Sequence, residues 1–112
     1  MDKKTLGQSV ARYRLTPAIA EKRIKALAAD SGNISWGQHA LGRMEEREIF
    51  DEAALRSLRA GHIEGEPELT PRGEWKCKMV RPTKGRREVG VVVIILKTHR
   101  LFVKTVEWED LK

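Results

Sequence analysis

The apolar run Val-Gly-Val-Val-Val-Ile-Ile-Leu at residues 89–96 limits the folds open to this chain more than any other segment. It is much shorter than the roughly 18 residues of a membrane-spanning helix. Its β-branched side chains favour a strand, and the lack of polar alternation is typical of a strand covered on both faces. We therefore expect a central strand here and no membrane span.

Strand signals also flank this run. Residues 75–79 alternate apolar side chains with lysines, which predicts a half-buried strand with a basic outer face. Residues 101–108 are expected to form the last strand, and residues 63–69 a short edge strand interrupted by a proline. Because the connections are short, neighbouring strands should run antiparallel. The sequence thus predicts an antiparallel sheet of three to four strands.

Helix signals occupy the part of the chain that precedes the strands. Thr16 suits an N-cap, Pro17 suits the first helical position, and Gly32 marks the end of that helix. A second helix is expected to begin at Ser35, which would act as its N-cap. Gln38 would reach back to complete a capping box.

The second helix should end near Glu48, and Ile49 and Phe50 should then pack inward. Asp51 is expected to cap a third helix, which Gly61 ends in the left-handed conformation. The fold class predicted from this order is α+β, a single domain over the whole chain. Its N-terminal helices would pack on one face of the C-terminal sheet.

Charge is unevenly distributed along the chain. Lysine and arginine outnumber aspartate and glutamate by 22 to 16, which gives a formal net charge of +6. Residues 1–44 carry +5, residues 45–70 carry −5, residues 71–104 carry +8 and residues 105–112 carry −2. The basic blocks favour a polyanionic partner and the acidic block a basic one, with solubility alone as the alternative explanation.

Several classes of protein are disfavoured by what the sequence lacks. Cys77 is the only cysteine, so an intrachain disulfide is excluded, and no Cys/His cluster has zinc spacing. Its place in an alternating strand indicates a small buried hydrophobe rather than a reactive thiol. No apolar segment follows the charged start, so no signal peptide is predicted. We expect a cytoplasmic protein that uses no cofactor and no metal.

The sharpest local motif is His-Ala-Leu-Gly-Arg-Met-Glu-Glu-Arg at residues 39–47. Spacing of four places His39, Arg43 and Arg47 on one side of a helix, and Glu46 can pair with Arg43. Arginine matches phosphate oxygens, and a neutral imidazole can take a proton from a ribose 2′-hydroxyl. These three residues are therefore the catalytic candidates for RNA cleavage without metal. A purely structural network is the alternative.

A second candidate site is the basic strand face with the loop that follows it. Basic residues beside a strand surface commonly contact nucleic-acid phosphates, although they can equally form a solvated face. The predicted nucleic-acid-binding residues are Lys76, Lys78, Arg81, Lys84, Arg86, Arg87 and Lys104.

The chain resembles a bacterial family of small domains of unknown function. The resemblance lies in the His39-Ala40-x-x-Arg43-x-x-x-Arg47 motif, in a Gly-His-Ile helix exit at residues 61–63, and in the strand pattern that follows. It covers roughly residues 34–108, whereas residues 1–33 form an arm and an extra helix. This family is similar in layout to the RelE and BrnT toxins, which place helices on a curved antiparallel sheet and often act as ribonucleases.

The resemblance implies an RNA-binding, metal-independent ribonuclease of toxin–antitoxin type, and it carries His39, Arg43 and Arg47 over as site residues. RNA is the expected substrate, with ribosome association left open, and an antitoxin protein is the expected partner. Two alternatives stay open at this point, a non-enzymatic nucleic-acid-binding module and a protein-interaction domain. The sequence leaves the oligomeric state undetermined.

Overall fold

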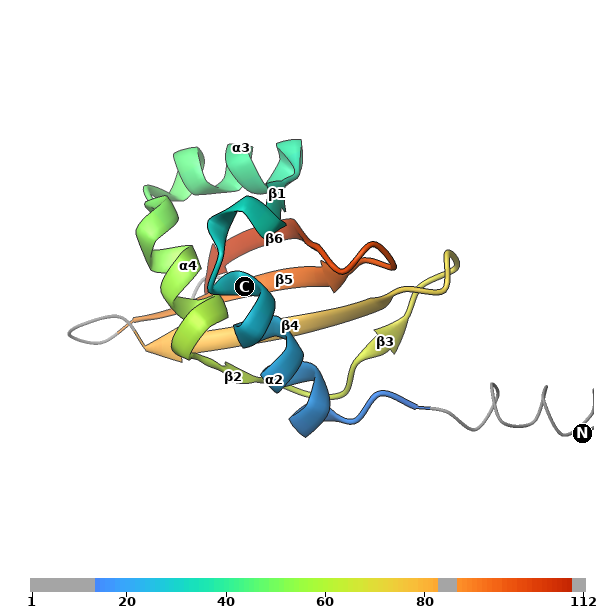
Figure 1. The fold of residues 1–112 in the computed structure, drawn as a ribbon. Coiled ribbons are helices and arrows are strands. Elements are labelled where there is room, and N and C mark those ends of the chain that lie inside the picture. Colours follow the sequence, from blue (N-terminus) through green and yellow to red (C-terminus); the bar gives the residue numbers. More distant parts are fainter. Residues whose placement is uncertain (1–13, 83–86, 110–112) are drawn as a thin grey trace, which may run out of the picture.

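Helices cover one face of a mixed sheet (Figure 1). Across residues 14–82 and 87–109, which are those that the computed structural model describes, there are three α-helices and six strands. The helices are α2 (Pro17–Ala28), α3 (Gln38–Arg47) and α4 (Asp51–Ala60). The strands are β1 (Ile34–Trp36), β2 (His62–Ile63), β3 (Glu68–Leu69), β4 (Trp75–Pro82), β5 (Glu88–Ile95) and β6 (Leu101–Trp108). The α+β prediction is confirmed.

Helix α2 begins where its sequence signals place it. The Thr16 side chain accepts a hydrogen bond from the Ile19 amide at 3.2 Å, and Pro17 occupies the first helical position, where its missing N–H costs nothing. The helix ends at Ala28, before the predicted Gly32, and a short 3-10 turn follows. The N-terminal arm predicted before this helix lies mostly outside the described residues.

The predicted start of the second helix is wrong. Residues Ile34–Trp36 form strand β1, which pairs in parallel with Leu101–Val103 of β6, and α3 begins only at Gln38. Gly37 is its N-cap and makes no side-chain capping bond, so the capping box does not form. The physical reason is that pairing with the edge of β6 satisfies the backbone groups of this segment and buries Ile34. A local helix cap would satisfy fewer of these backbone groups.

The sheet is larger than predicted and is not purely antiparallel. Its order is β1-β6-β5-β4-β2, with β3 also paired to β4, and only the β1–β6 pair is parallel. The expected edge strand at residues 63–69 is divided into β2 and β3, two short segments on either side of Pro67, because proline cannot donate to a ladder. Six strands in a mixed sheet replace the three to four expected.

Two details around α4 also differ from expectation. Phe50, not Asp51, is the N-cap, and its ring is 77% exposed, whereas Ile49 is buried as predicted. Gly61 has φ −82° and is therefore not left-handed. Glycine is needed there because a Cβ atom would collide with the carbonyl oxygens of Ser57 and Val80.

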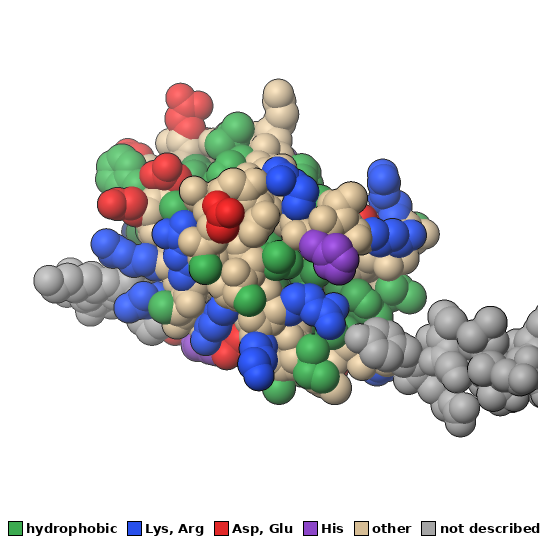
Figure 2. All heavy atoms as spheres, in the orientation of Figure 1, with side chains coloured by type: hydrophobic (Ala, Val, Ile, Leu, Met, Phe, Trp, Pro, Cys, Tyr) green, Lys and Arg blue, Asp and Glu red, His purple; other side chains and the backbone are tan. Residues whose placement is uncertain are grey.

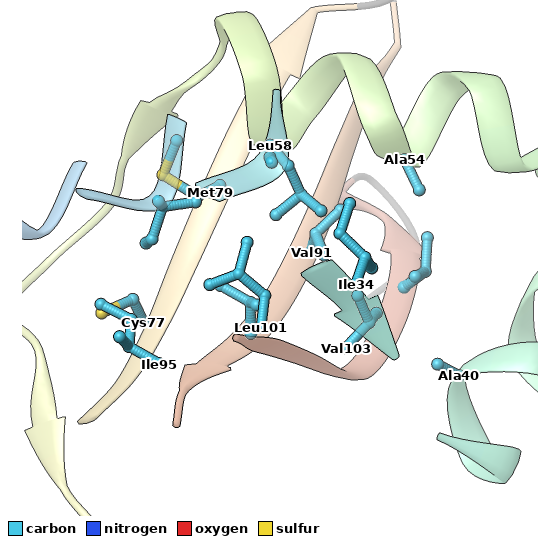
Figure 3. Packing of buried hydrophobic residues seen from close by; sticks show 14 of the residues in the cluster. Ile34, Ala40, Ala54, Leu58, Cys77, Met79, Val91, Ile95, Leu101 and Val103 are labelled. Atoms are coloured by element: carbon cyan, nitrogen blue, oxygen red, sulfur yellow. The ribbon is translucent and has the colours of Figure 1, made fainter. Parts of the chain in front are cut away.

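The core lies between the helices and one face of the sheet. Figure 3 shows Leu58 of α4 and Ile34 of β1 packed against residues of β5 and β6, among them Val91 and Leu101. No helix in the described part of the chain is long and apolar enough to cross a membrane.

The opposite face of the sheet carries Lys76, Lys78, Val92, Ile94 and Phe102, which lie side by side in the strand register; we call it the open sheet face. Val92 and Ile94 are only half-buried there. The helices lie on the other face, so the expectation that β5 is covered on both faces is met on one face only.

Candidate functional site

Helix α3 is held along strand β6 by contacts at both of its ends. The Gly37 amide donates to the Val103 carbonyl at 2.9 Å, and the Trp108 indole Nε1–H donates to the Arg47 carbonyl at 2.9 Å. Ala40 and Met44 face the core and are buried. The helix is therefore fixed in position and rotation, and its outer flank presents a defined set of polar side chains.

That flank forms a shallow hollow lined by His39, Gly42, Arg43 and Glu46, which we call the α3 hollow. His39 is exposed, and Arg43 is about a third exposed. An Arg43 guanidinium nitrogen donates to a Glu46 carboxylate oxygen at 3.4 Å, so the pairing expected from the sequence is present. The Nε–H of Arg43 is buried and has no hydrogen-bond partner among the described residues. The hollow therefore combines an exposed imidazole with a partly exposed guanidinium, whose Nε–H is buried without a hydrogen bond.

Arg47 does not line the α3 hollow. It lies in the last turn of α3, partly buried, where its carbonyl accepts the bond from Trp108. The guanidinium of Arg87 stacks on the same indole ring, 4.3 Å from the ring centroid. The Arg47 backbone carbonyl and the Arg87 guanidinium thus both contact Trp108, at the C-terminal end of the helix that carries His39 and Arg43.

The lysines of β4 are paired with glutamates. Lys76 Nζ lies 3.3 Å from a carboxylate oxygen of Glu68. Lys78 Nζ lies 3.2 Å from Glu64 and 2.7 Å from Glu109. Sequence reasoning missed these glutamates, although the acidic block at residues 45–70 was a signal for two of them. The lysine charge on the open sheet face is therefore largely compensated locally.

The other predicted nucleic-acid-binding residues are scattered. Lys104 is exposed and lines a hollow with Lys76, whereas Arg81 pairs in register with Val89 near the opposite end of β4. Lys84 and Arg86 lie outside the described residues. Figure 2 shows acidic side chains gathered where α3 meets α4, with Lys and Arg spread over the rest of that view. The structure brings His39 and Arg43 together, but it does not gather all candidates on one surface.

Gly42 is a residue of the α3 hollow that sequence reasoning did not single out. A Cβ atom at this position would have no atom within 4 Å, so the glycine is not required by packing. Its missing side chain leaves space between His39 and Glu46 on the helix surface. A glycine inside a helical pattern is the signal that could have drawn attention to it, because it weakens the helix.

Neither metal nor thiol chemistry is suggested by the described residues. Residues 14–82 and 87–109 contain no group of three or more His, Cys, Asp or Glu side chains placed to hold a metal ion. Burial raises the pKa of the Cys77 thiol to about 11, so this buried side chain is a poor nucleophile at neutral pH.

One comparison with known proteins gives a match. Residues 36–108 match the family described as Domain of unknown function (DUF4258). No curated protein sequence and no solved structure matches the chain. The matched region runs from the end of β1 to the end of β6, so it includes the α3 hollow and leaves α2 outside.

Proposed function

Because the chain belongs to the DUF4258 family, whose description names no activity, we propose a function from its own site: it binds RNA and cleaves it without metal, as a ribonuclease of toxin–antitoxin type. The observation that carries the proposal is the α3 hollow, where His39 lies beside an arginine that has a buried, unsatisfied N–H. A phosphate oxygen is a suitable acceptor for the exposed part of the Arg43 guanidinium, whose side chain is about a third exposed.

The cleavage step uses the two side chains in different roles. His39 takes the proton of a ribose 2′-hydroxyl, and the 2′-oxygen forms a bond to the adjacent phosphorus. The bond from phosphorus to the 5′-oxygen breaks, and that oxygen takes a proton from water. Arg43 stabilises the negative charge that develops on the phosphate. Glu46 positions the guanidinium by accepting from one of its nitrogens.

An RNA strand that leaves the α3 hollow would pass cationic residues along α3. At the C-terminal end of this helix, Trp108 contacts the backbone carbonyl of Arg47 and the guanidinium of Arg87. A ten-residue helix is about 15 Å long, which spans more than one nucleotide step. We assign Arg47 and Arg87 to neighbouring phosphates.

The toxin class of this proposal comes from the resemblance of the motif at residues 39–47 and of the strand pattern to the RelE and BrnT toxins. An antitoxin protein and, for the RNA, the ribosome are the partners that this class brings with it. The packing of helices on one sheet face is compatible with the class, but it is a layout that hosts many functions.

The test compares wild type with His39→Ala and Arg43→Ala, using His62→Ala as the matched control. His62 is an exposed histidine on β2 and lies outside the α3 hollow. Purified proteins are incubated with labelled RNA in EDTA, and binding is measured separately. We expect His39→Ala to slow cleavage by roughly 10²–10⁴-fold with nearly unchanged binding. Arg43→Ala should weaken both, and His62→Ala should do neither.

Two other results would replace the proposal. Binding that falls steeply with salt but yields no product would identify a nucleic-acid-binding module. Neither binding nor cleavage, together with normal growth of a bacterial host that expresses the soluble protein, would identify an interaction domain. In both cases His39 would be a surface residue of α3 without a catalytic role.

A further inference from the structure

The open sheet face contains a hollow that the α3 site does not use. It has a volume of about 400 Å³ and lies between the turn after β3 and the strands β4, β5 and β6. We propose that this hollow, which we call the sheet hollow, docks an acidic amphipathic segment of another protein. The proposal is independent of the proposed ribonuclease function, because the two hollows share none of the residues that the structure describes.

Aliphatic residues are part of the lining of the sheet hollow. Leu69 of strand β3, which pairs in register with Trp75 at the edge of the sheet, is 61% exposed. Pro71 in the following turn is also exposed, and Ile94 of β5 is half-buried. Ile94 belongs to the long apolar run at residues 89–96, whose other side faces the helices. A run of this kind is typical of a strand covered on both faces. An apolar side chain of a partner would supply the missing cover.

Three cations and two carboxylates line the sheet hollow, so one positive charge remains when each carboxylate is paired. Lys76 pairs with Glu68 at 3.3 Å, and Arg72 pairs with Glu74 at 3.8 Å. Lys104 also lines the hollow, and no ion pair is found for it among the described residues. A partner with carboxylates beside its apolar side chains therefore complements the hollow in both respects.

The turn between β5 and β6 adds a further cation to the rim. The Lys97 amide donates to Glu74 at 3.1 Å, which holds this turn against the hollow. The end of the Lys97 side chain lies beside Gly73, so its ammonium is directed at the same rim. Lys97 strengthens the preference for an acidic occupant.

The lining favours a protein segment over single-stranded RNA. RNA without base pairing is usually held by aromatic side chains on which bases stack. None of the described residues that line the sheet hollow is aromatic, and its exposed apolar residues are Leu69 and Pro71. Aliphatic side chains suit the insertion of another aliphatic side chain, as in peptide recognition by apolar grooves.

The experiment uses a fluorescein-labelled peptide in which leucines recur every third or fourth position among glutamates. Its controls are a scrambled peptide and a peptide with lysine in place of each glutamate. Fluorescence anisotropy measures binding to the full chain, to Leu69→Asp, to Lys104→Glu and to Phe50→Ser. Phe50 provides the matched control, because it is an exposed apolar residue remote from the hollow lining.

We expect saturable binding of the acidic peptide that Leu69→Asp and Lys104→Glu each weaken at least tenfold, while Phe50→Ser leaves it unchanged. Circular dichroism shows that each variant is folded. No saturable binding, equal binding of the control peptides, or indifference to Leu69→Asp would overturn the proposal. Self-association or RNA binding that Leu69→Asp abolishes would assign the hollow to a second copy or to RNA instead.

Discussion

Substituting alanine for Gly61 tests whether close packing, and not backbone conformation, requires glycine at the end of α4. An added Cβ atom would lie 2.5 Å from the Val80 carbonyl oxygen and closer still to that of Ser57. Real Cβ atoms essentially never approach within 3.0 Å of such neighbours. Both obstacles are backbone atoms. The Ser57 carbonyl oxygen accepts the hydrogen bond from the Gly61 amide at 3.0 Å, and Val80 is the β4 residue that pairs with His62.

The expected cost follows from these contacts. Overpacking that forces backbone shifts costs about 1–3 kcal/mol, and two backbone obstacles place Gly61→Ala near the upper end. Alanine recovers about 0.4–1 kcal/mol by restricting the unfolded chain. The free energy of unfolding should therefore fall by about 2 kcal/mol, which lowers the melting temperature by roughly 10 °C in a domain of this size.

Gly42→Ala is the matched control with the opposite sign. Gly42 lies inside α3, and an added Cβ would have no atom within 4 Å. Alanine in an exposed helix interior is favoured over glycine by about 0.5–1 kcal/mol. Urea unfolding of both variants, followed by circular dichroism, measures the difference. If Gly61→Ala is as stable as the wild type, the requirement for close approach at this position is refuted.

Two further predictions concern titratable groups. The pKa of Glu21 is lowered from its ordinary value of 4.5, mainly by the hydrogen bond from the Ile63 amide and then by Lys25. The ionised Glu21 carboxylate therefore stabilises the fold above pH 4.5, and this stabilisation is lost as the pH falls through the lowered pKa. Urea unfolding from pH 7 to pH 3 should show Glu21→Gln less stable than wild type at pH 7 and the gap closing in acid; a constant gap would contradict this. Cys77, with its pKa raised to about 11 and only 2% of its surface exposed, should resist a disulfide reagent at pH 8 until guanidinium unfolds the chain, and rapid labelling of the folded protein would contradict its burial.

The candidate site was predictable only in part. Residue spacing predicted that His39 and Arg43 share a helix flank and that Glu46 pairs with Arg43, because residues three and four apart are neighbours on a helix. It did not predict that Arg47 lies outside the α3 hollow, next to Trp108. That outcome depends on the packing of the end of α3 against β6, where the Trp108 indole donates to the Arg47 carbonyl.

The sequence by itself determined the elements whose signals are local. Thr16 and Pro17 start α2 where predicted, and β6 has the bounds expected from its pattern, because caps and alternation act between near neighbours in the chain. Only the tertiary structure decided that Ile34–Trp36 is a strand and that the lysines of the open sheet face meet glutamates. Those outcomes depend on partners distant in sequence. Pairing with β6 satisfies the backbone groups of residues 34–36 and buries Ile34, which stabilises this segment more than a local helix cap would.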